Sequence, residues 1–173
     1  GSGYPYVDVP GAARNFVRID EPFTPQGWFD GLKKGHVFVT SGPILEFGVN
    51  GQDIGSEIRV RRGELLRIRG KAAVNPDIDS LLSLELIEQG EIRRTILSDK
   101  QSEVTELAVD IAAEHGTWFV LRARDKSQNV VALSAPIYIV VDGQSWWKRS
   151  EVLSIVAKLK SLMQEILVKP DQP

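Results

Sequence analysis

A chain of 173 residues, of which 42% are hydrophobic and 25% charged, is long enough for one globular domain with a sizeable core. Its 21 basic and 23 acidic residues give a net charge of -2, which excludes a broad electrostatic attraction for nucleic acid or anionic lipid. The absence of cysteine excludes disulfides, thiolate nucleophiles and cysteine-bound metal centres.

The start of the chain carries no targeting signal. Residues 1–10 lack the basic start and apolar core of a signal peptide, and no run approaches the ~18 apolar residues that span a bilayer. We therefore expect a soluble chain with no membrane and no nucleic acid among its partners. Because Gly1-Ser2-Gly3 stands in place of an initiator Met, we expect a processed, tagged or excised chain whose upstream signal or domain is missing. The compartment stays open.

The amino-terminal region, residues 1–35, predicts an irregular lead, a strand and a short helix. Gly and Pro are frequent in the lead, and the strand covers Asn15–Ile19. The helix covers Pro25–Lys34, with Pro at the first helical position, where its fixed φ is suitable. Thr24 caps the free amide groups of the first turn, and Gly35 permits the left-handed conformation that ends the helix.

Short apolar runs separated by turn residues fill residues 36–143. The candidate strands cover 37–40, 44–49, 64–72, 82–88, 91–97, 104–111, 117–124 and 136–141. The turns between them lie at Asn50-Gly51, Arg62-Gly63, Asn75-Pro76, Gln89-Gly90, His115-Gly116 and Asp142-Gly143. Because about eight strands follow one another with no helix between them, the pattern favours an antiparallel β-sandwich. A closed barrel is the alternative.

Several strands alternate between apolar and polar residues, which is typical of a strand with one buried face. Arg67, Arg69 and Lys71 belong to a basic cluster and alternate with Leu66 and Ile68. We interpret this cluster as a solvated strand face, with a basic ligand-binding stripe as the alternative.

The carboxy-terminal region, residues 144–173, returns to helical spacing. One apolar stripe is formed by Val152, Ile155, Val156, Leu159, Leu162, Met163 and Ile166. Lys169-Pro170 ends the helix. The stripe must be covered, either by the sandwich itself or by a partner such as a second copy in a homodimer. The predicted fold is thus a mainly β chain: an antiparallel β-sandwich with a short N-terminal helix and a C-terminal amphipathic helix.

Catalytic and metal-binding patterns are missing from the sequence. His36 and His115 have no His or carboxylate at a spacing that suggests a shared metal site, so we predict no metal and no cofactor in this chain. His36 follows the helix, where it can satisfy a helix-end carbonyl. Ser41 lies one strand away from His36, too far for a nucleophile and its base, and we assign no catalytic residue.

Two further groups of side chains have ordinary structural interpretations. Thr40-Ser41-Gly42-Pro43 is typical of a corner that ends a strand, with the hydroxyls bonding backbone. No acid pair is indicated for Glu85, Glu88, Asp110 and Asp125, which we assign to solubility and local pairing.

Trp146 and Trp147 lie between the last strand and the C-terminal helix. They are candidates for a surface on which a carbohydrate stacks. The alternative, which we favour, is an aromatic plug that docks the helix onto the sandwich.

A set of short segments resembles one known family. They are Arg14-Asn15-Phe16-Val17, Leu32-Lys33-Lys34-Gly35, Val37-Phe38-Val39-Thr40-Ser41-Gly42-Pro43, Val49-Asn50-Gly51, Gly55, Ser134-Ala135-Pro136-Ile137-Tyr138 and Val141-Asp142-Gly143. In this order they resemble the carboxy-terminal β-rich region of metallohydrolase-like proteins of the polymerase-and-histidinol-phosphatase (PHP) superfamily, in the carbaryl-hydrolase-like branch. His36 replaces the usual Arg, and Phe16 a common Tyr, which indicates a divergent member.

The resemblance implies a non-catalytic accessory domain beside a hydrolase active site. The metal-binding domain of such proteins comes first, so any divalent metal would belong to a missing upstream PHP-like domain of the same protein, which is the implied partner. Arg14, Thr40 and Ser41 become candidates for the wall of the substrate cleft. The alternative function is a stand-alone β-sandwich module that binds carbohydrate or protein, with Trp146 and Trp147 as contacts.

Overall fold

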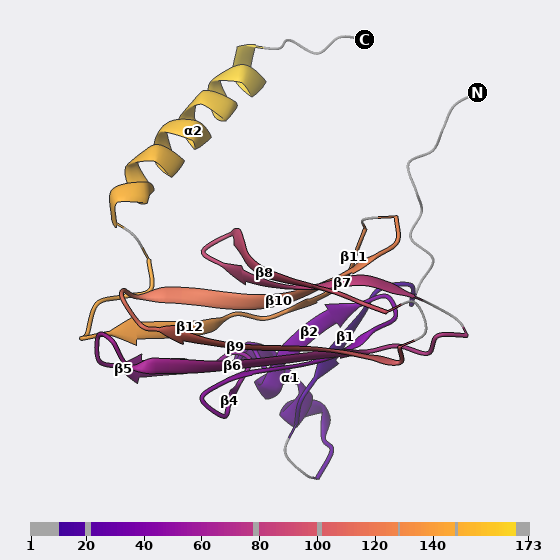
Figure 1. Cartoon of the computed structure of the whole chain (residues 1–173). Helices are drawn as coiled ribbons and strands as arrows, with labels where there is room; N and C mark the ends of the chain where they lie inside the picture. The colour runs from indigo at the N-terminus through magenta and orange to yellow at the C-terminus, as the bar shows by residue number, and fades with distance from the viewer. Residues whose placement is uncertain are drawn as a thin grey trace.

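The fold consists of two facing β-sheets and two helices (Figure 1). The computed structural model describes residues 11–19, 22–77, 80–99, 102–127, 129–147 and 149–168. Residues 1–10 of the predicted lead and the predicted stop at Lys169-Pro170 lie outside the described residues. Within the described ranges, the predicted antiparallel β-sandwich with an N-terminal and a C-terminal helix is confirmed.

The larger sheet, sheet A, is centred on β10. Its strands are β1 (Arg14–Val17), β2 (Val37–Thr40), β5 (Glu57–Val60), β7 (Leu81–Glu88), β8 (Glu91–Leu97), β10 (Thr117–Asp125), β11 (Val130–Ser134) and β12 (Ile137–Val141). β7 pairs along one edge of β10, and β8 continues the sheet beyond β7. The other edge of β10 is shared by β11 and β12, and β2 and β1 extend the sheet beyond β11.

The smaller sheet, sheet B, has the strand order β4-β3-β6-β9 and is antiparallel throughout. Its strands are β3 (Ile44–Val49), β4 (Gln52–Asp53), β6 (Leu65–Ala73) and β9 (Val104–Ala112). β3 and β4 are joined by the predicted turn at Asn50-Gly51, where both residues have positive φ, 50° and 76°. The turn at Gln89-Gly90 between β7 and β8 has the same character, with φ of 53° and 88°. These two-residue turns match the right-handed twist of hairpins.

The core lies between the two sheets. Its largest fully buried side chains include Phe119, Leu121, Leu84 and Leu86 from sheet A, and Leu66, Ile68 and Leu107 from sheet B. Leu121 presses directly on Gly70 of β6: a Cβ atom added at Gly70 would lie 2.7 Å from Leu121 Cδ1. The absence of a side chain at Gly70 therefore lets the sheets approach closely at this point.

α1 (Pro25–Lys33) is bounded by the residues that the sequence predicts. The Thr24 side chain accepts a hydrogen bond from the Gly27 amide at 2.9 Å. At the other end, Gly35 has a φ of 75°, its amide bonds the Leu32 carbonyl, and the His36 amide bonds the Gly31 carbonyl. This pair of bonds is a Schellman motif. The helix-end carbonyl is thus satisfied by the backbone of His36.

α2 (Arg149–Val168) follows β12 and stands clear of both sheets (Figure 1). Each of its side chains that the structure describes is exposed, including the apolar stripe from Val152 to Met163. The prediction that the sandwich or a partner covers residues 144–173 therefore stays a prediction.

Three strands were not predicted, namely β4, β5 and β11. β4 has two residues, and β5 alternates Glu57 and Arg59 with two buried aliphatic residues in a stretch too short to separate from its turns. β5 also departs from the antiparallel pattern, because it pairs parallel to β12. A parallel partner needs no hairpin between the two strands, so no local turn signal reports it.

Candidate functional site

The corner between β2 and β3 contains Thr40, a predicted cleft residue. Its side chain is 2% exposed, so it is not available at the surface of the described chain. The Thr40 hydroxyl oxygen accepts a hydrogen bond from the Gly42 amide at 3.0 Å and lies 2.6 Å from the Pro43 carbonyl oxygen and 3.2 Å from that of Val131. These contacts confirm the predicted corner, in which the hydroxyl bonds backbone.

The other two predicted cleft residues surround this corner at the surface. Arg14 pairs with Thr40 in the register of β1 and β2, and its side chain is exposed. Ser41 is also exposed, and its hydroxyl donates a hydrogen bond to the Val131 carbonyl at 3.3 Å. The structure thus brings Arg14, Thr40 and Ser41 together, while their contact with a substrate stays a prediction.

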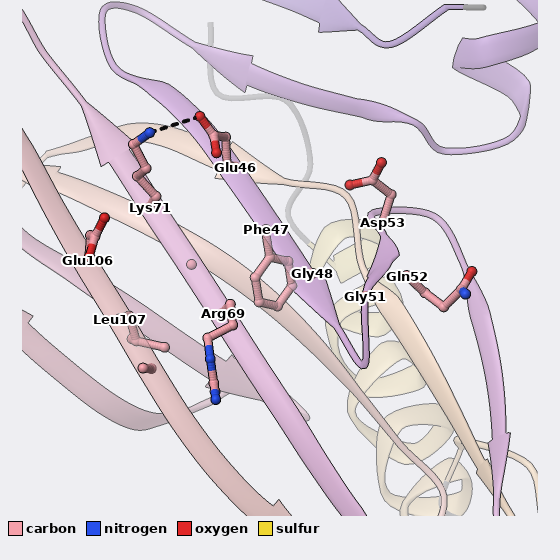
Figure 2. A pocket seen from close by; sticks show the side chains of 12 residues that line it. Glu46, Phe47, Gly48, Gly51, Gln52, Asp53, Arg69, Lys71, Glu106 and Leu107 are labelled. Carbon is pink, nitrogen blue, oxygen red and sulfur yellow. Dashed lines mark hydrogen bonds and ion pairs between the residues drawn. The ribbon is translucent and has the colours of Figure 1, made fainter.

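A depression of about 440 Å³ lies on the outer face of sheet B (Figure 2). Its lining residues come from the neighbouring strands β3, β4, β6 and β9 and from the turn that precedes β4. Gly48 and Ala108 stand opposite Arg69 in the sheet register, one on each side of it. Because these two neighbours have little or no side chain, the surface is hollowed beside the Arg69 side chain.

Charged side chains of both signs line this depression. Lys71 stands between Glu46 and Glu106 in the register and donates a hydrogen bond to Glu46 at 3.2 Å. Arg69 donates to Asp110 on β9 at 2.8 Å. Arg67 and Arg69 are exposed and Lys71 is half-buried, which confirms the predicted solvated face of β6. The depression gives the alternative of a basic ligand-binding stripe a definite location.

A second depression, of about 400 Å³, lies where sheet A extends past sheet B. Phe16 of β1 stacks on Phe38 of β2 with ring centroids 5.2 Å apart and planes 8° apart. Phe38 belongs to the core, whereas Phe16 is 40% exposed. Arg18 and Asp53 form an ion pair beside these rings, and His36 is among the other residues that line the depression.

The two depressions share Glu46, Phe47 and Asp53, so they adjoin across β3 and β4. We call the two together the β3 groove. The groove offers one exposed aromatic ring, carboxylates, guanidinium groups and an ammonium group, which suit a ligand with several hydrogen-bonding groups.

Arg18 and Asp53 are groove residues that were not predicted. The sequence offered one indication that Arg18 lies in the groove, because Arg18 directly follows the Arg14-Asn15-Phe16-Val17 segment. Asp53 had no such signal, because the two residues meet only when β4 folds beside β1.

The histidines lie apart from each other. His36 lines the second depression, and His115 lies in the segment before β10, at a separate small pocket. In the ranges that the structure describes, no three His, Asp or Glu side chains gather into a group that could hold a metal ion.

The two tryptophans after β12 have different environments. The Trp146 ring packs on Tyr138 of β12, with centroids 4.6 Å apart, and the Gln89 side-chain amide donates to the Trp146 carbonyl at 2.6 Å. Trp147 is 49% exposed. Trp146 therefore packs on the sandwich, and Trp147 presents its ring at the surface. That the two residues dock the C-terminal helix onto the sandwich stays a prediction.

A buried carboxylate lies on the outer face of sheet A. Glu85 is 6% exposed and accepts hydrogen bonds from Arg122 Nε at 2.6 Å and Arg124 Nε at 3.2 Å. The local pairing expected of Glu85 is confirmed, but the expectation that it is a solvated residue is wrong. A signal was present, since an acid inside the apolar run of β7 indicates a strand with two buried faces and a paired carboxylate.

Similarity of this chain to known proteins is found among solved structures. No protein-family model matches it, and no curated protein matches it. Among solved structures, the fibronectin(III)-like modules of CbhA from Clostridium thermocellum are similar, with 13% sequence identity and a TM-score of 0.39. The match covers 57% of this chain and 98% of that chain. The class of the protein, a β-sandwich with two helices, is therefore defined by its own architecture. Neither helix, over the part of the chain described, is long and apolar enough to cross a membrane.

Proposed function

We propose that this chain is the non-catalytic C-terminal β-sandwich of a larger PHP-like metal-dependent hydrolase, in which it shapes or supports the active site of an upstream domain. The observation that carries the proposal is the position of the β3 groove. It is lined by β1, β2 and β3, the strands that hold the densest segments of the PHP resemblance. β1 is also the first strand within the described residues, so a domain placed before it would be attached on the side of the groove.

In this role the groove forms one wall of the substrate cleft. Phe16 supplies an apolar surface, and Arg18 and Asp53 supply a donor and an acceptor at the open rim of the groove. The upstream domain would hold the divalent metal and carry out the hydrolysis. The β-sandwich would act on substrate binding and orientation, which affect catalytic efficiency without supplying a reacting group.

The first test is the mass of the native gene product in its source cells, measured by immunoblot. A band far above 19.2 kDa is expected, because the proposal needs an upstream domain in the same chain. A band near 19.2 kDa would show that the chain acts alone and would overturn the proposal.

The second test is Arg18→Ala in the native full-length protein, with p-nitrophenyl phosphate and p-nitrophenyl acetate as probe substrates. We expect kcat/KM to fall and Tm to stay unchanged, because exposed ion pairs contribute little to stability. Arg59→Ala is the matched control, since Arg59 forms an exposed ion pair with Glu57 outside the groove. Equal kcat/KM for the two variants and the wild type would argue against a cleft wall.

A second candidate function is a stand-alone module that binds carbohydrate, and the exposed Trp147 favours it. Exposed aromatic rings provide stacking surfaces for sugars, and Trp147 follows a residue that is held firmly on sheet A. A panel of oligosaccharides should then quench tryptophan fluorescence, and Trp147→Ala should remove the quenching. Quenching that persists in Trp147→Ala would exclude this residue as the contact.

A further inference from the structure

We propose that the outer face of sheet A is a docking surface for α2 of the same chain, so that the helix lies along β10 and covers this face. The inference goes beyond the proposed function, because it concerns the face of sheet A that is turned away from sheet B. Three observations support it. Two apolar surfaces are exposed, the chain leads from one of them to the other, and the length of the helix agrees with that of the sheet.

The first surface is the apolar stripe of α2. Within the described residues it consists of Val152, Ile155, Val156, Leu159, Leu162 and Met163, all of them exposed. α2 has 20 residues, and in proteins most of the stability of a helix comes from tertiary packing of its apolar face rather than from helix propensity. The stripe therefore needs a surface against which to pack.

The second surface is the outer face of sheet A. The register places Val39, Leu133, Arg122, Glu85 and Thr95 in one row across β2, β11, β10, β7 and β8. Flanking rows add further exposed aliphatic residues, so that the exposed apolar residues of this face are Val39, Ile92, Leu97, Val130 and Leu133. Exposed apolar residues that gather on one face mark an interaction surface.

The polar centre of this face is already prepared for burial. Glu85 is paired with both Arg122 and Arg124, and all three side chains are largely withdrawn from solvent. The guanidinium groups are held at the carboxylate, so the apolar stems of the arginines form part of the surface. A helix laid over this row would therefore meet paired charges, and the additional cost of desolvation is small compared with that of unpaired charges.

The connection between β12 and α2 leads onto the same face. Tyr138 stands opposite Trp118 on the outer side of sheet A, and Trp146 packs on Tyr138. α2 begins at Arg149, three positions after this anchor. Figure 1 shows that α2 leaves the body on the side of β10, β7 and β8, away from β6 and β9. The helix thus starts at one end of its proposed docking surface.

The lengths of helix and sheet agree. Leu133 stands opposite Arg122, four residues along β10 from Trp118, which corresponds to roughly 13 Å. Leu159 is ten residues from the start of α2, roughly 15 Å along the helix. If α2 runs along β10 from the Trp146 anchor, Leu159 arrives beside Leu133.

Two arguments favour α2 of the same chain over a second copy. The anchor at Trp146 fixes where the helix starts, and a short tether gives the helix a local concentration of about millimolar at this face. A second copy at micromolar concentration competes poorly with such a tether. The test must therefore distinguish docking of α2 on its own chain from exchange of α2 between two chains.

Cysteine crosslinking tests the docking directly, because the chain contains no cysteine of its own. The full chain with Leu133→Cys and Leu159→Cys is oxidised with copper phenanthroline and analysed by non-reducing gel and intact mass. A disulfide within one chain is expected. The matched control pairs Leu133→Cys with Ser161→Cys, which projects from the opposite side of the helix, and it should form much less of this disulfide.

Two outcomes of the crosslinking would overturn the proposal. Equal crosslinking in both pairs would mean that the helix moves without a defined docked position. Crosslinked dimers without intramolecular disulfide would mean that the surface is covered by a second copy.

Hydrogen exchange of the α2 amides supplies an independent measurement on the full chain without cysteines. Docking is expected to slow exchange at least about tenfold relative to Leu159→Glu, which places a charge in the stripe. Leu153→Glu is the control, because Leu153 lies off the stripe and should leave the protection unchanged. Wild-type amides that exchange as fast as those of Leu159→Glu would overturn the proposal.

Discussion

The outer faces of the two sheets differ in how far their charged side chains are exposed to solvent. On sheet B, Glu46 and Lys71 form an ion pair at the surface, with side chains 68% and 36% exposed. On sheet A, Glu85 lies buried between Arg122 and Arg124, with aliphatic residues around this cluster. The charges on the outer face of sheet B are solvated, whereas the outer face of sheet A carries paired, shielded charges among exposed aliphatic residues. The latter is typical of a surface on which another element docks.

A charged residue at an outward position of a strand does not by itself define a solvated face. On sheet B small neighbours at Gly48 and Ala108 leave the charges open to solvent, and the result is a groove. On sheet A two arginines at alternate positions of β10 converge on one carboxylate and shield it. The arrangement of side chains across neighbouring strands, rather than composition, decides whether an outward charge is solvated or shielded.

The sharpest test of this comparison removes one carboxylate from each face. Glu85→Gln should destabilise the protein by ~3 kcal/mol, because two arginines lose their shared charge in a largely buried site. Glu46→Gln is the matched change on sheet B and should cost less than ~1 kcal/mol. Urea unfolding followed by circular dichroism measures both. An equal loss in the free energy of unfolding for the two variants would show that the buried Glu85 carboxylate contributes no more to stability than the exposed Glu46 carboxylate.

A second test compares a glycine on the inner face of sheet B with a glycine on its outer face. Gly70→Ala should destabilise by ~1–3 kcal/mol, because the new Cβ would lie 2.7 Å from Leu121 in the packed core. Gly48→Ala on the outer face should change stability by less than ~1 kcal/mol, since its Cβ meets one carbonyl at 3.1 Å and Ala favours the strand backbone. Thermal unfolding distinguishes them, and a stable Gly70→Ala variant would contradict the close approach of the sheets.

A third test concerns the corner that joins the two sheets. Thr40→Ala should cost ~1–2 kcal/mol, because the Gly42 amide and nearby carbonyls lose their contact with a buried hydroxyl. Ser41→Ala, at an exposed hydroxyl with one long hydrogen bond, should cost less than ~0.5 kcal/mol. Ser41→Ala in the native full-length protein therefore tests the predicted cleft role cleanly, since a fall in kcat/KM could not be attributed to lost stability.

The smallest effect is expected at the turn between β10 and β11. The Asn129 side-chain amide donates to Asp125 at 3.1 Å, and this bond, together with backbone hydrogen bonds, lowers the pKa of Asp125. A lowered pKa means that the ionised form stabilises the fold above the unfolded pKa and that this contribution is lost as the pH falls through the folded pKa. Asp125→Asn should flatten this acid dependence slightly in urea unfolding at a series of pH values. An unchanged profile would contradict the role of the turn.

Much of the fold could be predicted because its signals are local. The Thr24 cap, the left-handed Gly35 and the turn at Asn50-Gly51 specify backbone conformations over a few residues, and they occur as expected. β5 and β11 escaped prediction. The pairing of β5 with β12 and of β11 with β2 depends on segments distant in sequence, although β11 also forms a hairpin with its neighbour β10.

The candidate site was predicted less completely. The sequence marked the strands that line the β3 groove, and it placed Arg14, Thr40 and Ser41 in one region. It did not reveal the pairing of Arg18 with Asp53, because the two residues lie far apart in the chain. The apolar run of β7 was a signal for the burial of Glu85, but the two arginines that pair with this residue come from the distant strand β10.

The class of the molecule could be predicted from local sequence patterns: a β-sandwich with a capped N-terminal helix, sharp glycine turns and a C-terminal helix with an apolar stripe. Periodicity and turn chemistry act between near neighbours, so they can be read without a structure. The folded arrangement was needed to show which residues share a groove, how a buried carboxylate is paired and which face of the sandwich is left apolar. Those properties arise from strand order and register, which bring distant residues into contact and set their exposure to water.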